Sequence, residues 1–159
     1  MAGLKFLHRL NVIACQVLLG AIVISVLIDV AMRYLLNRGF VASGEFVPYL
    51  FIWFSFLAAS LGFRQGEHFV VDVVLNAAGR ARTALQVVIH TVELVLFLGL
   101  IYFGWEIAMQ QMAQLTPYLG LPFGIVYLSV PLSATLMTVF TLEKLFRLFT
   151  APPPKDEKP

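Results

Sequence analysis

Charge is scarce in this chain. Only 13% of its 159 residues are Asp, Glu, Lys or Arg, whereas 60% are apolar, and the mean hydropathy is +0.87. A soluble domain carries about 25% charged residues, which it needs to cover its surface. The low charge therefore excludes a water-soluble enzyme, and the apolar fraction excludes a disordered chain. The composition indicates a membrane protein.

Sequence features that usually carry chemistry are also absent. Cys15 is the only cysteine, which excludes an internal disulfide framework. The sequence has no glycine-rich phosphate loop, no HExxH pattern and no paired His–Cys spacing typical of a metal site. The net charge of +2 is too small to indicate a nucleic-acid surface. We therefore expect no catalytic residue, no metal site and no bound cofactor.

Four apolar runs are long enough to cross a bilayer, which takes about 20 residues in a helix. Pro117, Gly120 and Pro122 interrupt the last long run and divide it between two helices. The pattern predicts an all-α integral membrane protein with one four-helix domain over residues 1–150. The expected spans lie near residues 10–35, 45–64, 83–115 and 122–148.

The basic residues predict the orientation of these spans. Nine of the eleven Lys and Arg lie in the N-terminal segment, the second loop and the C-terminal segment. Because cytoplasmic loops are enriched in Lys and Arg, we expect both termini in the cytoplasm. Residues 151–159, which are polar and rich in proline, then form a cytoplasmic tail.

The second loop contains a short amphipathic segment. His68, Asp72, Asn76 and Arg80 recur every four residues among apolar neighbours, as on a helix with a narrow polar stripe. A dozen residues cannot cross a bilayer, so a helix over residues 67–79 would lie in the cytoplasmic interface or pack on a partner. A plain connector that dips into the lipid is the equal alternative.

The third span is longer than the bilayer requires, since 83–116 would form a helix of about 50 Å. Its far end carries Glu106, Gln110 and Gln114 at four-residue spacing. We expect this end to project from the membrane and to contact another molecule on the extracytoplasmic side.

Ionisable residues within spans are costly, so each is a functional candidate. Asp29 and Arg33 are one helical turn apart and can neutralise each other. Glu45 begins the second span, where a carboxylate suits the helix dipole. Glu93 is expected near mid-membrane, either in a contact between helices or in a proton relay. The pairs Ala58/Gly62 and Gly120/Gly124 would allow close helix approach.

Several short segments, taken in order, resemble one known family. They are Arg33-Tyr34-Leu35-Leu36-Asn37, Ser43-Gly44-Glu45, Trp53, the run from Arg64 to Asp72, and the run from Thr116 to Pro122. Together they are similar to the signature of the DctQ-like small membrane subunit of tripartite ATP-independent periplasmic (TRAP) transporters. Gly44 departs from the pattern, because family members often carry an acid there.

The resemblance implies a function. A periplasmic binding protein would deliver an organic acid to a pair of subunits in the bacterial inner membrane. The large membrane permease subunit would hold the substrate and sodium sites and move as an elevator. This chain would be its fixed scaffold, without catalytic activity, cofactor or metal of its own.

The resemblance also suggests roles for individual side chains. Trp53 would be a packing anchor toward the large subunit, and most of the others would fix helix ends and loops. The candidate structural or subunit-interface residues are Asp29, Arg33, Asn37, Glu45, Trp53, Arg64, His68, Asp72 and Glu93.

Two other functions fit a small four-span protein. One is a self-contained proton-coupled exporter, in which Asp29 or Glu93 would exchange protons. The other is a membrane anchor subunit of a respiratory complex, which a haem absorption band would reveal.

Overall fold

The computed structural model describes residues 2–37, 39, 43–65 and 82–150. Within these ranges the regular structure is helical, apart from one isolated antiparallel bridge between Leu115 and Pro122. The elements are α1 (Ala2–Leu36), α2 (Ser43–Gln65), α4 (Arg82–Gln110), the short 3-10 turn η2 (Gln111–Ala113), α5 (Phe123–Tyr127) and α6 (Ser129–Thr150).

Four helical segments are long and apolar enough to cross a membrane. They are Phe6–Leu35, Ser43–Arg64, Thr83–Ala113 and Phe123–Phe146. The all-α class and the four long apolar helices are therefore confirmed. The interfacial helix expected over 67–79 and the tail 151–159 lie outside the described residues.

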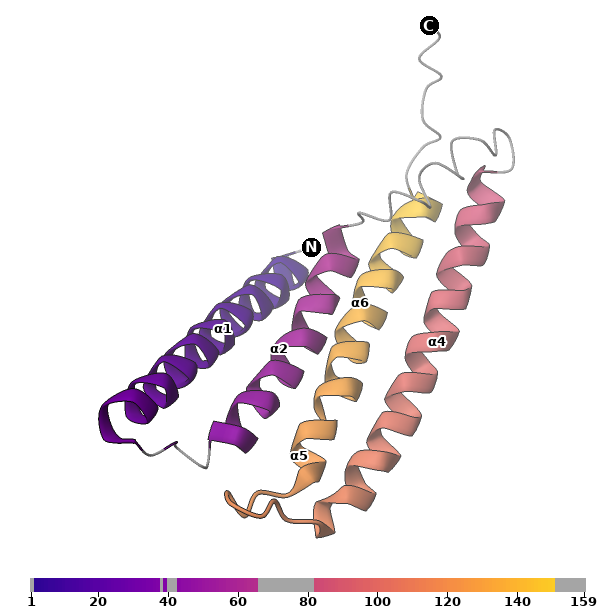
Figure 1. The fold of residues 1–159 in the computed structure, drawn as a ribbon. Coiled ribbons are helices and arrows are strands. Elements are labelled where there is room, and N and C mark those ends of the chain that lie inside the picture. The colour runs from indigo at the N-terminus through magenta and orange to yellow at the C-terminus, as the bar shows by residue number, and fades with distance from the viewer. Residues whose placement is uncertain (1, 38, 40–42, 66–81, 151–159) are drawn as a thin grey trace, which may run out of the picture.

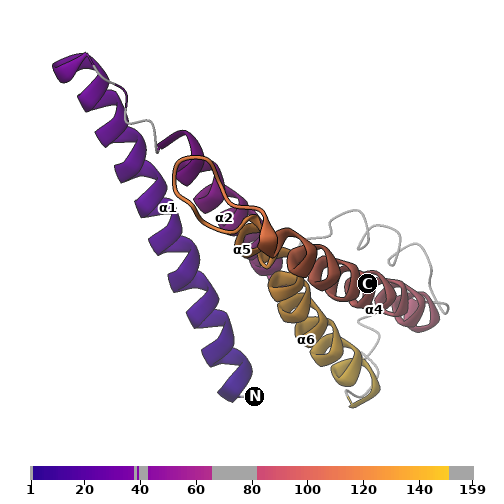
Figure 2. The ribbon, with the colours of Figure 1, turned by 90° about the horizontal axis from the view of Figure 1, so that it is seen from below.

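The four long helices stand in an open row rather than a closed bundle. Helix α1 packs on α2, α2 on α6, and α6 on α4, so the order in space is α1, α2, α6, α4 (Figure 1). Seen from below, α1 lies on one side of α2, whereas α6 and α4 lie on the other (Figure 2). The row exposes many large apolar side chains, as expected for helices that meet lipid or another subunit.

Three helix boundaries differ from the sequence-based expectation. The third span, expected to reach residue 115, ends earlier, because α4 stops at Gln110 and η2 stops at Ala113. Helix α1 begins at Ala2, about two turns before the expected span. The last span is divided at Leu128 into α5 and α6. Pro131 explains this division, because it has no N–H to donate to the carbonyl four residues earlier.

Small residues line the contact between the last two long helices. Gly104 of α4 faces Pro131, whose Cδ lies 3.1 Å from where a Cβ on Gly104 would be. A Cβ on Gly124 would overlap the carbonyl oxygen of Ala108, and it would lie 2.8 Å from the side chain of Met112. Van der Waals contact between close backbones holds membrane helices together, so these glycines set the α4–α5–α6 spacing.

The loop between η2 and α5 is compact. The backbone N–H of Thr116 donates to Leu121 O at 3.0 Å, and its hydroxyl accepts from Leu121 N at 3.1 Å. Gly120 adopts a φ of +63°, which favours glycine. Its N–H donates to Thr116 O at 3.1 Å. The loop is thus a closed turn that returns the chain directly into α5.

Candidate functional site

The candidate residues do not gather at one site. Those of α1 and the start of α2 lie at the end of the row where these helices meet, whereas Arg64 lies at the opposite end, near the start of α1 (Figure 1). Glu93 belongs to the interior of α4. His68 and Asp72 are outside the described residues. Among the described residues, the candidates therefore form several separate local arrangements.

The end of α1 is fixed by local interactions. Arg33 Nη2 lies 3.3 Å from Asp29 Oδ2, one helical turn away. The side chain of Arg33 is 68% exposed, whereas that of Asp29 is 18% exposed. Asn37 follows the last helical residue with a φ of +49°, and asparagine tolerates this left-handed conformation at a helix end better than most residues. Asn37 thus terminates α1.

Glu45 joins two segments that are far apart in sequence. It lies in the first turn of α2, where its charge suits the helix dipole. Its carboxylate also accepts hydrogen bonds from the backbone N–H groups of Tyr118, at 3.1 and 3.3 Å, and Leu119, at 3.1 Å. The single carboxylate therefore ties the α1–α2 half of the molecule to the loop that precedes α5.

Trp53 lines an apolar groove of about 360 Å³ formed by α2, α4 and the last span. Trp105 of α4 lies in the same groove and is 56% exposed. The groove is lined by Trp53, Ile101, Trp105, Leu128, Pro131, Leu132 and Thr135. A neighbouring hollow continues along α4 from Ile101 to Gln110 and also includes Glu106. Two large aromatic side chains thus flank an open apolar surface.

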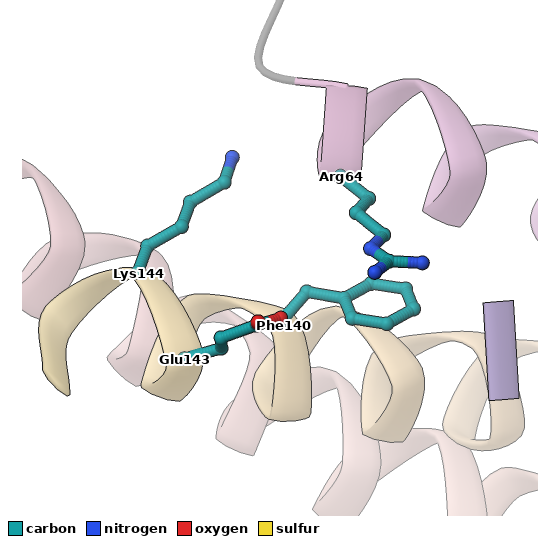
Figure 3. Close-up of a pocket in the computed structure, with 4 residues that line it drawn as sticks. All are labelled: Arg64, Phe140, Glu143 and Lys144. Carbon is teal, nitrogen blue, oxygen red and sulfur yellow. The ribbon is translucent and has the colours of Figure 1, made fainter. Parts of the chain in front are cut away.

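Two cationic side chains, Arg64 and Lys144, line one cavity at the end of the row where α2 and α6 end. Arg64 reaches from α2 toward α6, where its guanidinium carbon lies 5.1 Å from the ring centre of Phe140 (Figure 3). Lys144 of α6 donates from Nζ to the backbone oxygen of Phe63 at 2.8 Å. The same Nζ lies 4.6 Å from the ring centre of Phe63. These contacts join α2 to α6.

His90 and Glu93 form a pair within α4. His90 Nδ1 lies 2.8 Å from Glu93 Oε2, and each side chain is less than one-fifth exposed. Since the two residues are one turn apart on a helix, the imidazole satisfies the carboxylate locally. Within the described residues, this local contact accounts for Glu93 in the interior of α4 without requiring a proton relay.

Two side-chain contacts between helices were not predicted from the sequence. The first is the buried Asn11 of α1, whose Nδ2 donates to Ser60 Oγ of α2 at 2.6 Å and approaches Leu57 O at 3.4 Å. Asn11 and Gln16 are both polar residues in the same apolar run, and only the structure shows that Asn11 is the buried one. The second is Lys144, which sequence alone counts only as a charge that orients the protein.

The described parts of the chain hold no group of three or more His, Cys, Asp or Glu residues close enough to bind a metal ion. The arrangements above connect helices through packing and hydrogen bonds, and they present apolar surface.

Comparison with known proteins gives a consistent result. Residues 22–151 match the model of the family described as tripartite ATP-independent periplasmic transporters, DctQ component. The chain is 29% identical over 141 residues to a TRAP transporter small permease protein of Haemophilus influenzae, and the match covers 88% of each chain. It is 28% identical over 100 residues to the C4-dicarboxylate TRAP transporter small permease protein DctQ of Rhodobacter capsulatus, covering 61% of this chain and 44% of that protein.

Proposed function

Because this chain belongs to the DctQ component family of TRAP transporters, we propose that it is the stationary scaffold of a sodium-coupled system for organic acid uptake. In this role it stands beside a large, elevator-type membrane subunit that carries the substrate and sodium sites. A periplasmic binding protein delivers the organic acid. The family and both relatives are TRAP small subunits, so neither the exporter nor the respiratory anchor has comparable support.

The open row of helices is the observation that best supports a scaffold. A row leaves broad apolar faces uncovered, and these faces can pack against a second subunit. An elevator-type transport domain moves against a part of the transporter that stays fixed, and this chain can be that part. The described ionisable groups within the long helices are mostly engaged with one another or with the backbone, as in the pairs Asp29–Arg33 and His90–Glu93. An organic anion and several cations would require a larger set of convergent polar groups.

The orientation belongs to the same proposal. The ends of α2 and α6 and the start of α1 lie at one end of the row (Figure 1), and the sequence concentrates nine of its eleven Lys and Arg at that end and in its adjoining segments. We place this end in the cytoplasm of a bacterium, as the distribution of positive charge favours. The Glu45 contact and the end of α4 then face the periplasm.

The groove that Trp53 and Trp105 flank is the proposed seat of the large subunit. Aromatic side chains that fill pockets contribute strongly to interfaces, and truncation of such an anchor costs 2 kcal/mol or more, or about thirtyfold in affinity. Trp53→Ala and Trp105→Ala should each weaken co-purification with the large subunit. Phe51→Ala is the matched control, since Phe51 is an exposed aromatic of the same helix outside the groove.

Function is tested by uptake into proteoliposomes that contain this chain, its large subunit and the binding protein. We expect sodium-dependent uptake of an organic acid that requires all three components, and reduced uptake with Trp53→Ala. Full uptake by the large subunit without this chain would disprove the scaffold role. Intact assembly and uptake of both tryptophan variants would disprove the assignment of the groove alone.

A further inference from the structure

A small cavity separates α2 from α6 at the end of the row near the chain termini. It has a volume of about 240 Å³, and Arg64, Phe140, Glu143 and Lys144 line it (Figure 3). Arg64 is the last residue of the second apolar span, and Lys144 lies two residues before the end of the fourth. The cavity therefore lies where the hydrocarbon core gives way to headgroups.

The guanidinium of Arg64 has hydrogen-bond donors at this cavity that find no acceptor among the described residues. Its Nη1 is buried and finds no hydrogen-bond acceptor within the described part of the chain. The aromatic face of Phe140 gives the guanidinium a partial electrostatic partner at 5.1 Å. Buried N–H groups are nearly always paired in native proteins, and a guanidinium has five of them. An acceptor supplied from outside the chain would complete this set.

Lys144 adds a second cation to the same cavity. One of its three N–H donors is used by the backbone oxygen of Phe63 at 2.8 Å, which leaves two for another acceptor. Glu143 contributes one negative charge to the lining. Glu93 of α4 also interacts electrostatically with Lys144, but it does not line the cavity. Two cations and one carboxylate give the lining a net charge of about +1 at neutral pH.

We propose that Arg64 and Lys144 bind a phosphate group in this cavity. A phosphodiester carries one negative charge and several acceptor oxygens, which matches both the net charge of the lining and its remaining donors. At this depth in the membrane the phosphate comes from the headgroup of an anionic phospholipid, and free inorganic phosphate is the other source of the same chemistry. The bound headgroup would seal the contact between α2 and α6.

The test uses the full-length chain purified in detergent and native mass spectrometry. Phosphatidylglycerol, phosphatidylcholine and sodium phosphate are each added as the probe. We expect one phosphatidylglycerol to bind more tightly than phosphatidylcholine. The double variant Arg64→Gln with Lys144→Gln should weaken that binding about thirtyfold, since each Lys or Arg near an anionic lipid surface contributes about fivefold.

Two further variants distinguish binding at this cavity from a general effect of positive charge. Arg9→Gln with Arg33→Gln removes the same total charge at two exposed positions outside the cavity, and it should leave the binding unchanged. Arg64→Lys with Lys144→Arg keeps both charges and should restore most of the affinity, which controls for misfolding of the glutamine variant.

The outcomes are distinct. Selective binding of phosphatidylglycerol that only the Arg64 and Lys144 substitutions weaken supports the lipid source. Binding of inorganic phosphate with the same dependence, and no selective lipid, supports the phosphate site with the other source. Equal weakening by the control pair, or no binding of either probe, would overturn the proposal. None of these outcomes depends on the large subunit, so the scaffold role is tested separately.

Discussion

Asn11 and Ser60 share a buried hydrogen bond of 2.6 Å across the contact between α1 and α2. Asn11 is 4% exposed and Ser60 is fully buried. Because α1 packs on α2 at one edge of the row, this bond is a principal polar link of the first helix to the rest of the molecule. Ser60 also donates to Leu57 O at 2.7 Å, which orients its hydroxyl.

Asn11→Ala should therefore loosen α1. Hydrogen bonds between membrane helices contribute about 0.6 kcal/mol on average and rarely more than about 2 kcal/mol. We expect the free energy of unfolding in detergent micelles to fall by about 1 kcal/mol, measured by titration with sodium dodecyl sulfate. Gln16→Ala is the control, since Gln16 is an exposed polar residue of the same helix. An equal change in both variants would contradict a specific role for Asn11.

Glu45→Gln should release the loop before α5. The neutral amide can accept through one oxygen only, and hydrogen bonds to a charged acceptor are about twice as strong as neutral ones. A loss of about 1.4 kcal/mol would make the loop open about tenfold more often. The rate of proteolytic cleavage between residues 114 and 122 reports this opening.

Glu106→Gln is the matched control for that substitution. Glu106 is exposed and accepts from Gln110 at 3.3 Å within α4, so its neutralisation leaves the loop contact intact. Unchanged cleavage in Glu45→Gln, or equally faster cleavage in both, would show that the carboxylate does not tether the loop.

Gly124→Ala should push α5 away from α4. The added methyl would overlap the carbonyl oxygen of Ala108 and crowd Met112, and overpacking of this kind costs about 1–3 kcal/mol. Gly62→Ala is the control, because no atom lies within 4 Å of its added Cβ. Alanine also forms helices better than glycine. We expect a lower unfolding midpoint for the first variant and an equal or higher one for the second. The reverse order would refute the close-contact role of Gly124.

Glu93→Gln should leave sodium-dependent uptake by the complete transporter at the wild-type level. Glutamine retains a hydrogen-bonding partner for His90, which lies 2.8 Å from the carboxylate in the wild-type chain. If the chain instead exchanged protons as an exporter, loss of the titratable group would abolish transport. Uptake assays at matched protein levels decide between these results.

The helices were predictable from the sequence because long apolar runs have few alternatives in a membrane. The four long apolar helices appear in the structure, and the pairing of Asp29 with Arg33 follows from their four-residue spacing. The helix order in space was not predictable. It depends on which apolar faces fit together, and apolar patterning makes all faces of such helices look alike.

Long-range contacts also escaped prediction. Glu45 was interpreted as a helix-terminal charge, which its place in α2 allows, but its bonds to Tyr118 and Leu119 span more than 70 residues. The small-residue pattern predicted close helix contacts at both Gly124 and Gly62. The structure shows such a contact at Gly124 and none at Gly62. The spacing of residues in the sequence shows which of them share a helix face, but it does not show which other helix packs against that face.

The row of helices has a consequence for how the chain enters the membrane. At the two edges of the row, α1 packs on α2 and α4 packs on α6. The long helices of each pair are synthesised one after the other. The contact between α1 and α2 can close as soon as α2 leaves the translocation machinery, before α4 and α6 exist. The contact between α4 and α6 can close once α6, the last of these helices, follows. The remaining contact, between α2 and α6, joins the two pairs of helices, and Lys144 and Phe63 help to form it. The subunit is therefore expected to be built as two preassembled halves, and a substitution at the contact between α2 and α6 should leave both halves inserted but unjoined.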